Sequence, residues 1–273
     1  MNFEFSVEQR GRSAGWPVVF LHGFMGSASD WGSVIARLED EFCCYAVDLP
    51  GHGGATPAGS EVPLEFTALA RRLMETIHRL DDRPVHIVGY SLGGRLALAA
   101  ACSNAARVRS LVLESASPGI ADATERRERE RSDDAWAEKI ERHGIEDFLQ
   151  EWYAQPVFRS LAARPDLLES LLRERSTTDP VWAAKCLREL GVGRQPEVWS
   201  QLGGLAVPTL LVTGEEDTRF TALAGRMESL MPQAAVAVVP AAGHNVHLEQ
   251  PDTFAGLIRD FFDRGESQLR SAP

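Results

Sequence analysis

The segment Val85-His-Ile-Val-Gly-Tyr-Ser91-Leu-Gly-Gly-Arg95 decides the fold of this chain. A short apolar run at 85–88 leads into the pattern G-x-S-x-G, and an apolar helical pattern follows at 92–101. Glycines on both sides of the serine allow a turn sharp enough to expose its Oγ at the top of a sheet. The helix that follows directs its free N–H groups to the same place. The segment therefore predicts a strand, a tight turn and a helix, with Ser91 as a candidate nucleophile.

Short apolar runs and longer helical patterns alternate on both sides of this segment. We expect strands at 18–21, 43–47, 85–88, 108–113, 209–213 and 235–239, and helices at 30–38, 66–80, 92–101, 223–231 and before Phe262. Such alternation predicts an α/β fold, with a mainly parallel sheet and helices on both of its faces.

Residues 118–202 interrupt the alternation, because the pattern there is helical throughout and contains no credible buried strand. The strand pattern resumes afterwards, which favours a helical cap laid over the strand ends, where open parallel sheets bind their ligands. Two independent domains are the alternative. The expected organisation is a core in two parts, residues 1–117 and 203–273, with an inserted cap at 118–202.

The composition excludes several classes of protein. The 273 residues are 44% hydrophobic and 25% charged, which are globular rather than disordered proportions. A formal net charge of -11 argues against nucleic acid as a partner. No stretch reaches the roughly 18 apolar residues of a membrane helix, and the first five residues do not resemble a signal peptide. We expect a cytoplasmic protein with reduced cysteines, no membrane contact and no obligate protein partner.

Nearly all of the positive charge is carried by arginine, since Lys139 and Lys185 are the only lysines in the sequence. A GC-rich genome, which favours arginine codons, explains the large total number of arginines. The planar guanidinium nevertheless binds a carboxylate through two oxygens at once, so the positions of individual arginines are informative.

The candidate nucleophile needs a base, and the sequence offers seven histidines: His22, His52, His78, His86, His143, His244 and His247. The chain order serine, acid, histidine of this turn type leaves the last two. His244 is preferred, because it follows Gly243 in a loop after the last expected strand. A metal site formed by His244 and His247 is disfavoured, because no further ligands cluster there.

The acid and the oxyanion hole follow from the neighbouring loops. Asp217 lies just after the strand at 209–213 and is preferred for holding the imidazole; Glu215 and Glu216 are the alternatives. The backbone N–H groups of Leu92 and Phe24 are the candidate oxyanion donors.

These motifs together resemble the α/β-hydrolase superfamily. The resemblance rests on His22-Gly23-Phe24, Asp48-Leu-Pro-Gly-His-Gly53, the turn at Ser91, Asp217 and Gly243-His244. It implies an α/β-hydrolase fold outside the cap and a Ser91, Asp217, His244 triad. Further matches at 89–95, 114–119, 128–133, 147–158 and 242–247 are similar to the 2-succinyl-6-hydroxy-2,4-cyclohexadiene-1-carboxylate synthases, pyruvate-eliminating enzymes of menaquinone and phylloquinone biosynthesis.

This second resemblance implies a small-molecule substrate with three carboxylates, a Ser91 that acts as a base, and no cofactor or metal. It also implies substrate contacts from Tyr90, Arg95, Arg129, Trp152, Tyr153 and Arg175. From the residues alone, 125–134 is equally a solvated helix face, Trp152 and Tyr153 are equally cap core, and Arg173 competes with Arg175.

Two other functions fit the same pattern. A hydrolase of esters or of carbon–carbon bonds would use the same triad with water, and a ligand-binding receptor is a more distant alternative. The feature that favours the synthase is Arg95, one helical turn after Ser91, where most esterases have no need of a charge.

Overall fold

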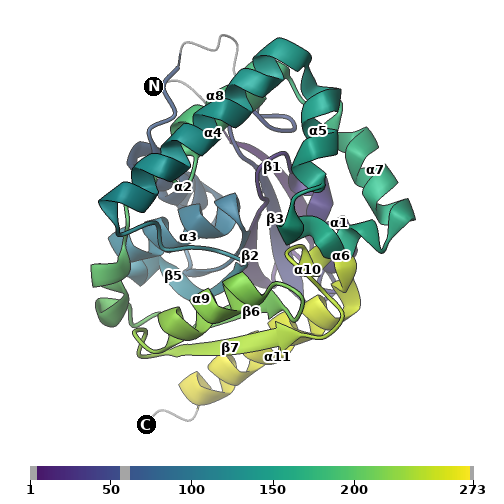
Figure 1. The fold of residues 1–273 in the computed structure, drawn as a ribbon. Helices are drawn as coiled ribbons and strands as arrows, with labels where there is room; N and C mark the ends of the chain where they lie inside the picture. Colours follow the sequence, from purple (N-terminus) through teal and green to yellow (C-terminus); the bar gives the residue numbers. More distant parts are fainter. Residues whose placement is uncertain (1–4, 56–61, 271–273) are drawn as a thin grey trace.

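A seven-stranded sheet forms the centre of the molecule, as the computed structural model of residues 5–55 and 62–270 shows (Figure 1). The strands lie in the order β1-β3-β2-β4-β5-β6-β7, and every pairing from β3 to β7 is parallel. They are β1 (Ser6–Gly11), β2 (Trp16–Leu21), β3 (Phe42–Asp48), β4 (Val85–Tyr90), β5 (Val108–Glu114), β6 (Thr209–Gly214) and β7 (Ala234–Val239). The mainly parallel sheet expected from the sequence is confirmed.

The edge strand β1 is absent from the sequence expectation. It pairs antiparallel with β3, and its residues are half-buried or exposed. The polar sequence Ser-Val-Glu-Gln-Arg-Gly has no run of apolar residues, because an edge strand faces solvent on one side. The apolar signal that reveals the inner strands is therefore missing here.

Helices cover both faces of the sheet, as expected. The first face carries α2 (Phe66–Leu80), α3 (Leu92–Ser103) and α9 (Thr218–Glu228), whereas the second carries η1 (Ala28–Trp31), α1 (Gly32–Ile35), α10 (Val246–Glu249) and α11 (Pro251–Arg270). The short η2 (Ala105–Arg107) follows α3. Each face has its own buried apolar cluster. Leu69, Leu96 and Met227 belong to the first cluster, and Trp31 and Phe254 belong to the second.

Several helices differ from their expected bounds: α3 ends at Ser103 instead of residue 101, and α11 continues beyond Phe262 to Arg270. The helix expected at 223–231 begins earlier, as α9 at Thr218, because the Asp217 carboxylate accepts a hydrogen bond from Phe220 N (3.2 Å) and caps its first turn. The helix expected at 30–38 is instead two short turns, η1 and α1.

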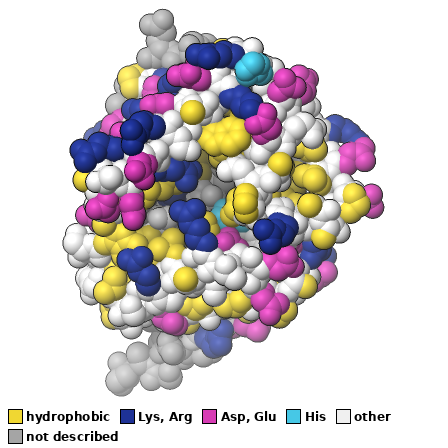
Figure 2. Space-filling model, viewed as in Figure 1, with side chains coloured by type: hydrophobic (Ala, Val, Ile, Leu, Met, Phe, Trp, Pro, Cys, Tyr) yellow, Lys and Arg dark blue, Asp and Glu magenta, His cyan; other side chains and the backbone are white. Residues whose placement is uncertain are grey.

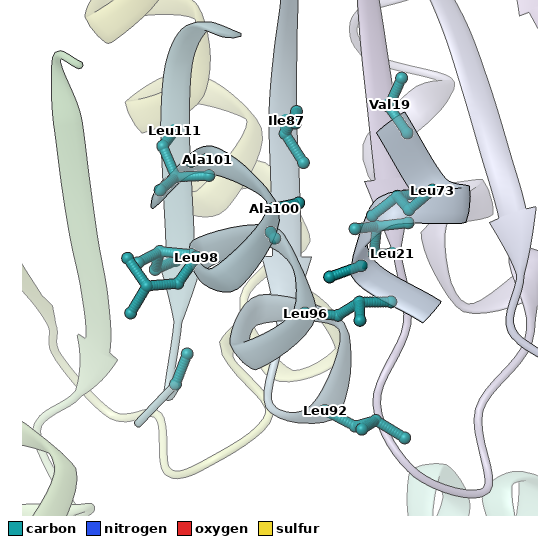
Figure 3. Packing of buried hydrophobic residues seen from close by; sticks show 14 of the residues in the cluster. Val19, Leu21, Leu73, Ile87, Leu92, Leu96, Leu98, Ala100, Ala101 and Leu111 are labelled. Carbon is teal, nitrogen blue, oxygen red and sulfur yellow. The ribbon is translucent and has the colours of Figure 1, made fainter. Parts of the chain in front are cut away.

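Helix α3 is buried on most of its sides. Figure 3 shows Leu96 and Leu98 pointing from it to opposite sides, toward Leu21 and Leu111 respectively. An apolar surface around the whole helix suits an element enclosed between a sheet and its covering helices. Within the twelve residues of α3 the sole charged side chain is that of Arg95, which is also buried.

Between β5 and β6 the chain is helical and forms the cap. Its elements are α4 (Ala123–His143), α5 (Ile145–Tyr153), η3 (Pro156–Phe158), α6 (Arg159–Ala162), α7 (Pro165–Arg175), α8 (Pro180–Leu190) and η4 (Trp199–Gly204). Figure 1 shows α4 and α8 side by side, with α5 and α7 continuing the arch. The cap has a separate apolar cluster that includes Ile140, Phe148 and Leu161.

The expected boundaries of the cap fall close to these elements. Helix η4 crosses the expected boundary at residue 202, and its Leu202 packs in the apolar cluster of the sheet. Residues 1–4 and 271–273 of the expected core parts lie outside the described residues. Across the described parts of the chain, no helix combines the length and the apolar character needed to cross a membrane.

The packing of α3 against β2 predicts a strict size limit at Gly93. A Cβ atom there would lie 2.3 Å from the carbonyl oxygen of Leu21. We expect Gly93→Ala to lower the free energy of unfolding by about 1–3 kcal/mol, measured by urea denaturation. The control is Gly256→Ala in α11, where a Cβ atom meets nothing within 4 Å. Gly256→Ala should raise the free energy of unfolding by about 0.5–1 kcal/mol. Equal changes in this free energy at both sites would contradict the packing argument.

Candidate active site

Ser91 occupies the sharp turn between β4 and α3 in a conformation that few residues adopt. Its φ of 47° and ψ of -107° lie outside the regions favoured by residues with a Cβ. Two hydrogen bonds hold the turn: Ser91 N donates to Glu114 O (2.9 Å), and Gly93 N donates to His22 O (3.0 Å). The strained turn thus fixes Ser91 between β5 and the loop that follows β2.

His244 and Asp217 form a buried pair at the ends of β7 and β6. The distance from Nδ1 of His244 to Oδ2 of Asp217 is 2.6 Å, and both residues are about 95% buried. When Nδ1 donates to the carboxylate, Nε2 of the ring is left as an acceptor for a proton. Of the three acids weighed from the sequence, Asp217 is thus the one that contacts the imidazole. Glu216 is exposed, and the Glu215 carboxylate accepts from Ala241 N.

A buried carboxylate, Glu249, fixes the loop that carries His244. Glu249 accepts hydrogen bonds from the backbone N–H groups of Gly243 (3.1 Å) and Asn245 (3.2 Å), the two neighbours of His244. The cap contributes as well, because Ser160 Oγ donates to Glu249 (3.0 Å) and Arg164 lies 3.6 Å from it. The backbone on both sides of the histidine is therefore tied to one carboxylate that the cap also holds.

The expected oxyanion donors lie on two loops that approach each other. A Cβ atom on Gly23 would lie 3.5 Å from Cβ of Ser91, which places the loop after β2 against the serine. Met25 N donates to His52 Nε2 (3.1 Å), while Gly93 N is bonded to His22. Among the described residues no acceptor pairs with the N–H groups of Phe24 or Leu92. Both amides are thus available to an oxyanion.

Two buried histidines, His22 and His52, support this loop as neutral acceptors. His22 Nε2 accepts from Leu49 N (2.9 Å), and His52 Nε2 accepts from Met25 N. Burial lowers the pKa of His22 to about 4, although Asp30 opposes the shift. Burial, reinforced by His22, lowers the pKa of His52 to about 3. Both rings are therefore structural, not proton carriers near neutral pH.

A cavity of about 510 Å³ opens between the carboxyl ends of the strands and the cap. Nine of the eleven expected site residues line it: Phe24, Tyr90, Ser91, Leu92, Arg95, Arg129, Trp152, Asp217 and His244. Figure 2 shows the hollow in this face, with Lys and Arg side chains around it and a histidine at its base. The structure thus brings together residues that are up to 220 positions apart.

Arg95 lies in this cavity with neutral partners. Its guanidinium donates to the side-chain oxygen of Gln195 (3.0 Å) and to the carbonyl of Leu190 (2.9 Å). Burial and, to a lesser extent, the charge of Arg129 lower the pKa of Arg95 to about 9, while Asp133 opposes the shift. Arg95 therefore remains cationic at neutral pH and is stabilised further by an anion in the cavity.

The charge of Arg129 acts on Arg95, but Arg129 itself has a carboxylate partner. Its Nε donates to Asp133 (2.7 Å), which is buried and also accepts from Gly193 N. The charge run at 125–134 is accordingly not a purely solvated helix face. One buried carboxylate faces two guanidinium groups, so this end of the cavity carries excess positive charge.

The structure does not place Arg175 or Tyr153 among the residues that line this cavity. Arg175 is 95% buried and donates to Asp30 (2.7 Å), and Tyr153 packs beside it. Burial disfavours the charge, but the Asp30 carboxylate outweighs burial and raises the pKa of Arg175. Arg175 thus links α7 to η1, and the substrate contacts expected of Arg175 and Tyr153 stay predictions. The competing Arg173 is exposed and pairs with Glu169.

His247 belongs to a separate buried pair. Its Nδ1 lies 2.9 Å from Glu114, and its ring stacks on Trp31 with centroids 4.4 Å apart. This hydrogen bond joins α10 to β5 and leaves His247 out of the cavity lining. In the described parts of the chain, no group of three or more His, Cys, Asp or Glu side chains has the geometry to hold a metal ion.

The sequence did not single out all of the lining residues, and Phe158, Arg159, Arg219 and Phe220 are four of those that it missed. They lie on η3, α6 and α9, next to positions that packing places near His244. The rings of Phe158 and Phe220 contact the His244 ring edge to face, at centroid distances of 5.9 and 4.6 Å. No sequence spacing indicates these contacts, because they depend on how the cap sits over β6.

Comparison with known proteins agrees with this geometry. Residues 18–257 match the model of the alpha/beta hydrolase family. The 2-succinyl-6-hydroxy-2,4-cyclohexadiene-1-carboxylate synthase of Serratia proteamaculans is 35% identical over 93% of this chain and 96% of its own. The enzyme of the same name from Salmonella agona is 36% identical over 89% and 93%. The structure titled MenH from S. aureus superimposes with a TM-score of 0.91, at 30% identity over 97% of this chain and all of that one.

The lowered pKa values of His22 and His52 predict acid sensitivity. Between their folded and unfolded pKa values the unfolded chain binds more protons, so stability is complete above about pH 6.5 and is lost as pH falls toward 4. Each of the two rings should lower the free energy of unfolding by about 2 kcal/mol as the pH falls from 7 to 5. We therefore expect His52→Gln to reduce the difference in the free energy of unfolding between pH 7 and 5 by about 2 kcal/mol, as measured by urea denaturation. The exposed His78→Gln is the control, and identical pH slopes in both variants would contradict the assignment.

Proposed function

The chain belongs to the alpha/beta hydrolase family, and from its cavity and its relatives we propose that it is a 2-succinyl-6-hydroxy-2,4-cyclohexadiene-1-carboxylate synthase. The substrate would be 2-succinyl-5-enolpyruvyl-6-hydroxy-3-cyclohexene-1-carboxylate, and the second product pyruvate. One observation carries the proposal: a buried arginine without a carboxylate partner lies one helical turn after Ser91, in the cavity that also holds the Asp217–His244 pair.

In this proposal, Ser91 and His244 remove a proton instead of attacking a carbonyl. Ser91 takes the proton from the ring carbon next to the succinyl ketone while its own hydroxyl proton passes to Nε2 of His244. Asp217 stabilises the imidazolium that forms, as its 2.6 Å contact with Nδ1 allows. The resulting enolate oxygen accepts hydrogen bonds from Phe24 N and Leu92 N.

Elimination then completes the reaction without water or an acyl-enzyme. The electron pair of the enolate moves through the ring double bond, and the carbon–oxygen bond to the enolpyruvyl group breaks. The departing enolate of pyruvate gains the proton that His244 holds, so the triad returns to its starting state. The reaction makes the enzyme a carbon–oxygen lyase that uses hydrolase residues and no cofactor.

The substrate carries three carboxylates, which suits a cavity with an excess of guanidinium groups. Among the residues that the structure describes, the lining contains four arginines against three carboxylates, and two of those carboxylates are bonded to Arg129 and His244. We also propose that the enzyme acts in the cytoplasm, without an obligate protein partner. The free thiols of Cys43, Cys44, Cys102 and Cys186 support the cytoplasmic location.

The first test is the release of pyruvate. Purified protein should release pyruvate from the enolpyruvyl substrate much faster than it hydrolyses p-nitrophenyl acetate, as measured by a coupled pyruvate assay. Ser91→Ala and His244→Ala should each lower kcat by a factor of about 10³ or more. Rapid ester hydrolysis without pyruvate would instead establish a serine esterase, and full activity in either variant would mean that the base lies elsewhere.

The second test separates the role of Arg95 from that of the triad. We expect Arg95→Met to lower kcat/KM for the tricarboxylate about 100-fold, because a charged hydrogen-bonding partner is lost, and to change hydrolysis of a neutral ester less than threefold. Arg109→Met, near the Trp16 ring and outside the cavity, is the control. Equal losses on both substrates would make Arg95 a structural residue.

A further inference from the structure

Two arginines of the cavity, Arg159 and Arg219, have no part in the proposed reaction. Arg159 follows Phe158 in the cap, and Arg219 precedes Phe220 at the start of α9. Because both rings contact His244, the two guanidinium groups come from elements that pack on the catalytic imidazole. Both arginines line the same cavity as Ser91 and Arg95.

These two side chains differ from the other arginines of the cavity in their surroundings. Both are exposed, and among the described residues neither has an ion pair with a carboxylate. The guanidinium of Arg219 lies 6.0 Å from the centre of the Phe220 ring. Asp133 and Asp217 are bonded elsewhere, and the remaining carboxylate of the lining, Glu216, is exposed. An anion in the cavity would therefore meet two cations without a competing partner.

The arginines of the cavity differ in their access to water and in their partners. Arg95 is buried and Arg129 is half-buried, and both are held by hydrogen bonds, to Gln195 and the Leu190 carbonyl for Arg95 and to Asp133 for Arg129. The exposure of Arg159 and Arg219 places them at the open end, and Figure 2 shows positive side chains beside the hollow. Ser91 and His244 line the same cavity, and Phe158 and Phe220, which neighbour Arg159 and Arg219 in the chain, contact the His244 ring. A ligand with carboxylates on both sides of its reacting carbons fits this distribution.

We propose that Arg159 and Arg219 form a second carboxylate subsite, at the mouth of the cavity, that binds the enolpyruvyl carboxylate of the substrate and then the released pyruvate. This inference rests on the proposed function. The leaving group has to reach solvent, and Arg159 and Arg219 are the exposed arginines of the lining, so the carboxylate that departs belongs at this pair. The carboxylates that stay on the ring then remain with Arg95 and Arg129. One pair of arginines thus binds the carboxylates of the ring product, and the other pair binds the carboxylate of the leaving group.

The test compares a double variant with a matched control. Arg159→Gln/Arg219→Gln removes two charges at the mouth, and Arg142→Gln/Arg264→Gln removes two charges from exposed positions outside the cavity. Turnover is followed by the ultraviolet absorbance of the conjugated diene product, with added pyruvate as a competitive inhibitor. Hydrolysis of a neutral ester reports whether the triad is intact.

We expect the double variant at the mouth to raise the KM for the substrate and the inhibition constant of pyruvate about tenfold each. Ester hydrolysis should stay within twofold of the parent protein, and the control variant should leave all three quantities unchanged. An unchanged inhibition constant for pyruvate would overturn the subsite, even if KM rises. Equal increases in both double variants would also overturn it, because they would reflect net charge alone.

Failure of the subsite is distinguishable from failure of the proposed function. If the parent protein releases no pyruvate from the substrate, the synthase function is wrong. The subsite is then judged by calorimetric titration of the parent protein and the double variant with pyruvate. Binding that is lost in the variant supports a carboxylate subsite, whereas no binding, or equal binding in both proteins, overturns it.

Discussion

The tight turn at Ser91 is the constraint on which the rest of the site depends. Its backbone conformation is unfavourable for a residue with a Cβ, and two hydrogen bonds, from Ser91 N to Glu114 and from Gly93 N to His22, maintain it. These bonds tie the serine to β5 and to the loop after β2. The nucleophile, the oxyanion loop and the start of α3 therefore have one fixed relative position, and Arg95 follows because it lies one turn along that helix.

The cap completes the site by contacts that are polar as well as apolar. Ser160 and Arg164 hold Glu249, which in turn binds the backbone on both sides of His244, and Arg175 binds Asp30 behind the oxyanion loop. Each buried charge in these contacts has a partner, as the cost of burying an unpaired charge requires. Arg95 is the exception, since its partners are neutral. That exception indicates where the ligand's negative charge belongs, although the protein as a whole has a net charge of -11.

The sequence was sufficient for the features that local patterns encode. The inner strands have continuous apolar runs, and the glycines around Ser91 and the late position of His244 identify the turn and its base. The polar edge strand β1 lacks such a signal. Arg159, Arg219 and the displacement of Arg175 from the cavity could not be predicted either, because each depends on how the cap packs over the sheet. The spacing of residues along a helix indicates which side chains share a face, but it does not indicate which other element packs on that face.

The central claim is that a serine hydrolase framework performs an elimination, and the fate of solvent oxygen tests it most directly. Turnover in water enriched in oxygen-18, followed by mass spectrometry of the ring product, separates elimination from hydrolysis. Elimination yields a ring product lighter than the substrate by the mass of one pyruvate, with no added label. A ring or succinyl product that has gained labelled oxygen would contradict it and would assign water, not an enolate, as the reacting partner.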